Sequence, residues 1–277
     1  MKQTLHSSPY KAFVIFIGIA LTAGCSSFDK PSKPEPVPEI HPGILQGYLP
    51  MKAHPDSLAL VPPPPAEGSI ARSLDKKINQ EAMTLRGSAR WKLAYQDSIL
   101  MFPEAAGTFS CALNAPITEQ DTPHLYMLLR RTLADAGLST YTAKDHYKRT
   151  RPFVLNNEPI CSPDDEKLLR GDGSYPSGHT AIGWAWALIL SEIAPEQANA
   201  ILARGWAFGQ SRMICNVHWQ SDVMMGRTMG AAAVSVLHAD PKFRAAVEHA
   251  RQELIEVRAK GLPPTRNCIA ETAALAE

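Results

Sequence analysis

The chain has 277 residues, of which 45% are hydrophobic and 20% are charged, and its formal net charge is +1. This composition is that of a globular protein with a sizeable core, long enough for one large domain or two small ones. The near-neutral charge argues against the broad basic face that nucleic-acid binding normally needs, so we expect no nucleic-acid partner.

The first 24 residues are expected to be a signal peptide. Lys2 and Lys11 flank a polar start, and residues 12–21 form an apolar run that is too short to be a comfortable transmembrane span. The small residues that run into Cys25 resemble a bacterial lipobox, which implies cleavage before Cys25 and attachment of lipid to it. The alternative is a plain secretory signal with an incidental cysteine. We therefore expect an exported bacterial protein, periplasmic or an outer-membrane lipoprotein, that contacts the membrane only through a lipid anchor.

Residues 25–66 are expected to be a proline-rich tether. Five prolines lie between residues 31 and 42, and four more occupy positions 62–65. Proline removes backbone hydrogen-bond donors and favours an extended chain, which would hold a domain away from a surface. Whether residues 47–60 pack on the domain is left open by the sequence.

The pattern becomes helical from residue 67, where apolar side chains recur three to five residues apart. A helix starting near residue 138 is expected to end at Arg151, because Pro152 disfavours the helical conformation of the residue before it. Four further helices are predicted near 177–193, 195–214, 219–237 and 241–260. With no long alternating run, residues 67–262 are predicted to form an all-α domain with short loops, followed by a C-terminal tail over 263–277.

Three polar clusters interrupt this helical pattern. The first is Lys144-Asp145-His146-Tyr147-Lys148-Arg149-Thr150-Arg151-Pro152, the second is Pro176-Ser177-Gly178-His179, and the third is Ser211-Arg212 followed by His218 and Asp222. Their order and spacing resemble the three-part signature of the type 2 phosphatidic acid phosphatase superfamily. The surrounding residues are similar to one branch of it, the bacterial class A nonspecific acid phosphatases. The resemblance implies a helical bundle of the type 2 phosphatidic acid phosphatase and vanadium haloperoxidase kind.

The second cluster is a glycine-rich turn that leads into a helix, whose first backbone N–H groups and dipole favour an anion. Lys144 and Arg151 are seven residues apart, which is two helical turns, and are expected to share one face of a helix. By resemblance, the phosphate-binding residues are Lys144, Arg151, Ser177, Gly178 and Arg212. Lys148 and Arg149 lie outside the signature positions, and we interpret them as a solvated helix face.

The catalytic roles also follow from the resemblance. His218 would be the nucleophile, Asp222 would orient its ring, and His179 would protonate the leaving oxygen and later activate water. This chemistry forms a phosphohistidine and needs neither a cofactor nor a metal, and the sequence shows no spacing typical of metal ligands. We therefore predict a broad-range acid phosphatase that acts on small phosphomonoesters and can transfer the phosphoryl group to alcohols.

Four cysteines remain after Cys25, and in an exported chain they permit two disulfides in three pairings. If the first and third clusters meet at one pocket, Cys161 with Cys215 is plausible, which leaves Cys111 with Cys268. Free, buried thiols are the alternative.

Two other functions stay open at this point. A vanadate-dependent haloperoxidase-like enzyme would share the pocket residues, and a phosphate-binding lipoprotein would need the cations but not the two histidines. The sequence does not fix the oligomeric state, although relatives commonly associate, so a homo-oligomer is also open.

Overall fold

A computed structural model describes residues 33–277, which form one compact unit. The predicted signal peptide and Cys25 lie outside the described residues. The helices of this unit are α1 Ser57–Leu60, α2 Ile70–Met83, α3 Ala89–Gln96, α4 Ser110–Leu113, α5 Pro123–Leu138, α6 Tyr141–Tyr147, α7 Pro152–Asn156, α8 Glu166–Gly171, α9 Gly178–Ile193, α10 Ala198–Ile214, α11 Gln220–Leu237, α12 Pro241–Ala259 and α13 Cys268–Leu275. Two short antiparallel strands, β1 Glu39–His41 and β2 Ile44–Leu45, precede them. The all-α prediction is confirmed, with this hairpin as a small addition.

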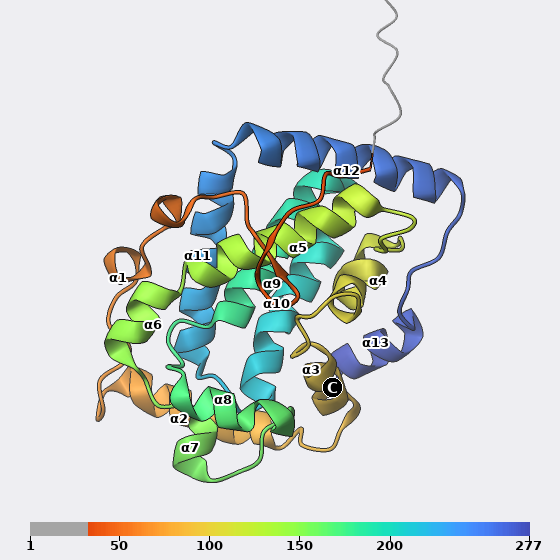
Figure 1. The fold of residues 1–277 in the computed structure, drawn as a ribbon. Coiled ribbons are helices and arrows are strands. Elements are labelled where there is room, and N and C mark those ends of the chain that lie inside the picture. The colour runs from red at the N-terminus through yellow and green to blue at the C-terminus, as the bar shows by residue number, and fades with distance from the viewer. Residues whose placement is uncertain (1–32) are drawn as a thin grey trace, which may run out of the picture. The chain divides into compact units, whose positions relative to one another are not determined.

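Helices α9, α10 and α11 form the centre of the bundle, flanked by α5, and α12 lies across one end (Figure 1). Helix α11 packs unusually close to the first turns of α9. A Cβ atom at Gly226 would lie 2.5 Å from the Ser177 carbonyl oxygen, and one at Gly230 would lie 2.4 Å from that of Ala181. Only glycine permits this approach, which brings the starts of α9 and α11 together.

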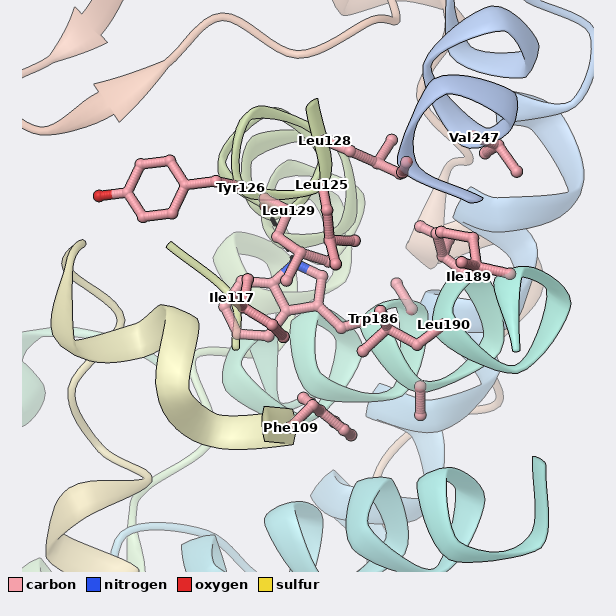
Figure 2. Close-up of a cluster of buried hydrophobic side chains, with 14 of the residues drawn as sticks. Phe109, Ile117, Leu125, Tyr126, Leu128, Leu129, Trp186, Ile189, Leu190 and Val247 are labelled. Atoms are coloured by element: carbon pink, nitrogen blue, oxygen red, sulfur yellow. Dashed lines mark hydrogen bonds between the residues drawn. The ribbon is translucent and has the colours of Figure 1, made fainter. Parts of the chain in front are cut away.

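The main apolar core lies between α5, α9 and α12 (Figure 2). Trp186 of α9 is its largest side chain, and its indole Nε1 donates to the carbonyl oxygen of Leu129 on α5 at 3.0 Å. A buried indole N–H needs such a partner, so this bond fixes the two helices against each other. The core thus supports the helix whose first turn carries the second polar cluster.

The second half of the predicted tether packs on the domain instead of standing free. Tyr48 and Leu49 are buried, and their backbone N–H groups donate to the Asp135 carboxylate of α5 at 2.8 and 2.9 Å. Tyr48 also meets Phe243 of α12 edge to face. The prolines prevent regular structure but not packing, because a buried carboxylate here satisfies the backbone donors.

The predicted C-terminal tail is also part of the domain. It contains α13, and a disulfide joins Cys268 at the start of this helix to Cys111 in α4. The Glu277 side chain accepts a hydrogen bond from the backbone N–H of Arg90 at 2.9 Å. The folded unit is therefore longer at both ends than the predicted range of 67–262.

The helices predicted from 177 to 260 are confirmed to within a few residues, but the one near 138–151 is wrong. Helix α6 ends at Tyr147, because Lys148 adopts a left-handed conformation with φ 42°. Arg151 is extended and precedes α7. Lys144 and Arg151 therefore do not share a helix face. Among the described helices, none is long and apolar enough to cross a membrane.

Candidate active site

The three clusters meet at one buried site where the end of α6, the start of α9, the end of α10 and the start of α11 converge. These segments and the loop before α7 supply all eight predicted residues: Lys144, Arg151, Ser177, Gly178, His179, Arg212, His218 and Asp222. The link between α9 and α11 is direct, since the backbone N–H of Ser177 donates to the carbonyl oxygen of Asp222 at 3.0 Å.

His218 lies just before α11, and Asp222 is in the first turn of that helix. The Asp222 Oδ2 atom accepts from the backbone N–H of Trp219 at 2.8 Å and lies 3.4 Å from His218 Nδ1. Because a carboxylate only accepts, Nδ1 carries the proton and the lone pair is on Nε2. Nε2 accepts from Arg151 Nη1 at 3.1 Å. The two residues thus meet as predicted, although His218 itself is outside the helix.

Arg149 is not part of a solvated face, so that interpretation is wrong. Its side chain is only 9% exposed and its guanidinium donates to both Asp222 Oδ1 and Asp75 Oδ2 of α2. It also donates to the Ser221 hydroxyl at 2.7 Å. The left-handed turn at Lys148 ends α6. Of the two residues, only Lys148 is exposed to solvent. Arg149 therefore holds the carboxylate that orients His218.

Lys144 and Arg151 are joined by the loop before α9. Lys144 Nζ donates to the Gly173 carbonyl oxygen at 2.7 Å, and Arg151 Nη2 lies 3.2 Å from the same oxygen. Asp172 contacts both cations, at 3.3 Å from Lys144 Nζ and 2.8 Å from Arg151 Nη2. Burial, followed by the neighbouring charge of Arg151, lowers the pKa of Lys144 to about 8.

Arg212 differs from the other two cations because part of its guanidinium is unpaired. It is 1% exposed, and within the described residues its Nε and Nη1 atoms have no hydrogen-bond partner. Burial and the nearby Arg151 lower its pKa to about 10. A buried guanidinium with free donors is unfavourable unless something accepts from it, and an oxyanion matches its planar fork.

His179, in the first turn of α9, is the second histidine of the site. Its Nε2 atom lies 3.0 Å from the carbonyl oxygen of Ser98, which can only accept, so Nε2 carries a proton and Nδ1 is free to gain one. Ser177 caps the same helix by accepting from the backbone N–H of Thr180 at 3.3 Å. Its hydroxyl therefore stabilises the turn at Gly178, where the backbone N–H groups begin the helix.

Burial lowers the pKa values of both histidines well below the ordinary value of 6.5. The next cause is Arg151 for His218 and Arg212 for His179. Burial therefore favours the neutral form of each ring in the free protein. The neutral form of His218 is the one that can act as a nucleophile.

A buried ionic network supports the third cluster from behind. Ser211, next to Arg212, donates to Asp97 Oδ2 at 2.6 Å, and Asp97 pairs with Arg204. Arg204 in turn lies 3.4 Å from Glu271 of α13. The Cys161–Cys215 disulfide closes the other side of this cluster, and both predicted cysteine pairings are present. Among residues 33–277, no group of His, Cys, Asp and Glu side chains is placed to hold a metal ion.

The helical fold and the site agree with a match to a known protein family. Residues 125–245 match the family model described as the PAP2 superfamily, the abbreviation for type 2 phosphatidic acid phosphatase.

Three similar proteins agree with this match. A non-specific acid phosphatase of Providencia stuartii is 45% identical, over 73% of this chain and 82% of its own. One of Salmonella typhimurium is also 45% identical, over 70% and 78%, and an acid phosphatase of Zymomonas mobilis is 40% identical, over 76% and 80%. The chain therefore belongs to the PAP2 superfamily and, within it, to the class A nonspecific acid phosphatases.

Proposed function

We propose that the protein hydrolyses a broad range of small phosphomonoesters without a metal, through a phosphohistidine at His218. Its family membership makes it an acid phosphatase, and the geometry of the site supports this particular mechanism. The observation that carries the proposal is the pair of buried, unpaired donors of Arg212, Nε and Nη1, in the same site as the His218–Asp222 pair. It offers an oxyanion site next to a nucleophile that is already oriented.

In the first step the phosphoryl group takes the place of His218 Nε2 as acceptor from Arg151 Nη1, which frees the Nε2 lone pair. Nε2 attacks phosphorus, a P–N bond forms, and the bond to the ester oxygen breaks. Arg212, Arg151 and Lys144 stabilise the charge on the phosphoryl oxygens. Asp222 stabilises the positive charge that develops on the His218 ring. His179 gives a proton to the leaving oxygen, and then takes one from the water that hydrolyses the P–N bond.

The neutral state of His179 in the free protein fits this scheme only if the substrate changes it. A phosphate anion bound at Arg212 would raise the pKa of the nearby ring, because an opposite charge favours the protonated form. The proton that the leaving group needs would thus arrive with the substrate. An alcohol in place of water would receive the phosphoryl group, giving phosphotransfer.

The proposal is tested with aryl and alkyl phosphates on purified protein lacking residues 1–24. His218→Ala should abolish hydrolysis of both, and His179→Ala should harm the alkyl ester more, because a poor leaving group depends on a strong proton donor. Activity should persist in chelator, and vanadate should inhibit. Loss of activity in chelator that a divalent metal restores would contradict the mechanism.

We further propose that the protein is exported and anchored by lipid at Cys25. The apolar run before this residue and the proline-rich segment after it support the proposal.

A further inference from the structure

Asp172 is the acidic side chain in direct contact with the cations that the proposed function assigns to phosphate. Its carboxylate lies within 3.3 Å of Lys144 Nζ and 2.8 Å of Arg151 Nη2, and its side chain is 31% exposed where theirs are 4% and 2% exposed. The scheme of attack, proton donation and charge stabilisation given above makes no use of it.

Asp172 and an incoming anion compete for the same donors. The Arg151 Nη2 atom already donates to Asp172 and to the Gly173 carbonyl oxygen, and Nη1 to Val217 and His218. Of the three site cations, Arg212 is the one whose buried donors lack a partner among the described residues. An anion that reaches Lys144 and Arg151 from Arg212 must therefore lie near the Asp172 carboxylate or displace it.

The charges around the site make this competition selective. The proposed function assigns three cations, Lys144, Arg151 and Arg212, to the phosphoryl group, and Asp172 offsets one of their charges. Of the other acids, Asp222 is paired with Arg149 and with the ring of His218, and Asp97 is paired with Arg204. Asp165 also lies close enough to Arg212 to interact with its charge. Burial favours the neutral form of both histidines. Repulsion from Asp172 is proportional to the ligand's charge, so it doubles between a singly and a doubly charged anion.

We propose that Asp172 is a specificity-determining residue that shifts the selectivity of the site from doubly charged toward singly charged phosphomonoesters. Phosphomonoesters lose their second proton with a pKa of about 6, so the shift is toward the form that dominates in acid. This inference rests on the proposed function, because it assumes that the three cations hold the substrate's phosphoryl group.

The test uses two tetrahedral anions whose charges stay fixed across the working pH range. Sulfate carries two charges and methyl sulfate carries one. Their affinities are measured by calorimetric titration of the wild type and of Asp172→Asn at one mildly acidic pH. Because the repulsion scales with charge, the substitution should tighten sulfate binding by about tenfold and methyl sulfate binding by about threefold. Asp172→Ala should change both in the same direction.

A matched control is Asp164→Asn, which removes the same charge from an exposed position eight residues earlier in the chain. It should leave both affinities unchanged. If Asp172 instead serves to hold Lys144 and Arg151 in place, Asp172→Asn would weaken the binding of both sulfate and methyl sulfate. That outcome, or an unchanged ratio of the two affinities, overturns the proposal. The titrations need no turnover, so a folded protein that binds sulfate but hydrolyses no ester would count against the proposed function alone.

Discussion

At the scale of single residues, the orientation of His218 depends on a chain of contacts that starts outside the three signature clusters. One oxygen of Asp222 faces His218 Nδ1, and the other accepts a hydrogen bond from Arg149. Arg149 also donates to Asp75. Without Arg149, the Oδ1 atom of this buried carboxylate would lose its side-chain partner, which is costly and leaves the carboxylate freer to turn. Asp75 and Arg149 are thus positioning residues for the nucleophile.

Arg149→Met should lower kcat/KM by roughly 10- to 100-fold, less than the loss of about 10,000-fold known for altering the carboxylate of such a pair itself. Without Arg149, the Asp222 charge acts more fully on His218 and raises its pKa. Since His218 must be neutral to attack, the acid limb of the pH–rate profile should move to higher pH. Arg149→Lys should restore part of the rate.

The measurement is kcat/KM against pH for an aryl phosphate. Arg170→Met, which removes an exposed guanidinium paired with Glu166, is the control and should leave the profile in place. A uniform loss at every pH would mean that Arg149 affects only the fold.

The two histidines also predict the pH dependence of the unaltered enzyme. The profile of kcat/KM reports the free protein, in which both pKa values lie below 6.5. Activity requires His218 without a proton and a proton available for the leaving oxygen. The rate should therefore follow a bell whose maximum lies on the acid side of 6.5 and falls as pH rises toward neutrality. A profile that is flat across the histidine range would remove the paired-histidine assignment.

At the scale of elements, the sequence predicts helices well where packing is apolar and poorly where it is polar. The helices from α9 to α12 carry regular apolar spacing and were located to within a few residues. Helix α2 lies in the region where the pattern becomes helical, but its apolar residues do not mark the face that is buried. Ile70 is 91% exposed, whereas Arg72, Asp75 and Asn79 are buried against the third cluster.

The reason is that apolar periodicity does not report a polar interface. Arg72 stacks over Trp219 at 4.0 Å, and Asn79 donates to Asn216 at 2.9 Å. These contacts join α2 to a distant segment, so no local spacing reveals them. The resemblance located the signature residues, but Arg149 and Asp97 carry no signature and needed the tertiary structure.

Helix α13 illustrates an element that is fixed by cross-links and charge more than by its own sequence. The Cys111–Cys268 disulfide spans 157 residues, and a loop of this length removes much entropy from the unfolded chain. Replacing both cysteines by serine should cost roughly 2–5 kcal/mol of stability. A thermal melt should show a lower Tm, and kcat at low temperature should change little.

The Cys161–Cys215 pair provides the contrast. It spans 54 residues, and its Cys215 lies three residues after Arg212. Loss of this disulfide should therefore reduce kcat as well as Tm. An unchanged Tm after removal of Cys111 and Cys268 would show that the Cys111–Cys268 disulfide is not formed or adds nothing to stability.

At the scale of the whole molecule, residues 33–277 belong to one compact unit, so most of the predicted tether over 25–66 is part of the domain. A lipid at Cys25 would be joined to this unit by residues 26–32 and not by the whole predicted tether.

Cys25→Ser should abolish acyl labelling and release the enzyme from the membrane fraction. Activity per molecule should be unchanged because every residue of the proposed site lies between positions 144 and 222. Fractionation with an activity assay measures this. Continued membrane association of the variant, with normal processing, would contradict the lipid anchor.

The most direct test of the mechanism follows the configuration at phosphorus. A phosphomonoester made chiral with oxygen isotopes is cleaved in the presence of an acceptor alcohol, and the configuration of the transferred group is determined. Two successive in-line displacements, the first by His218, predict retention of configuration and no transfer by His218→Ala. Inversion would mean one direct attack on the substrate, and would contradict His218 as the nucleophile.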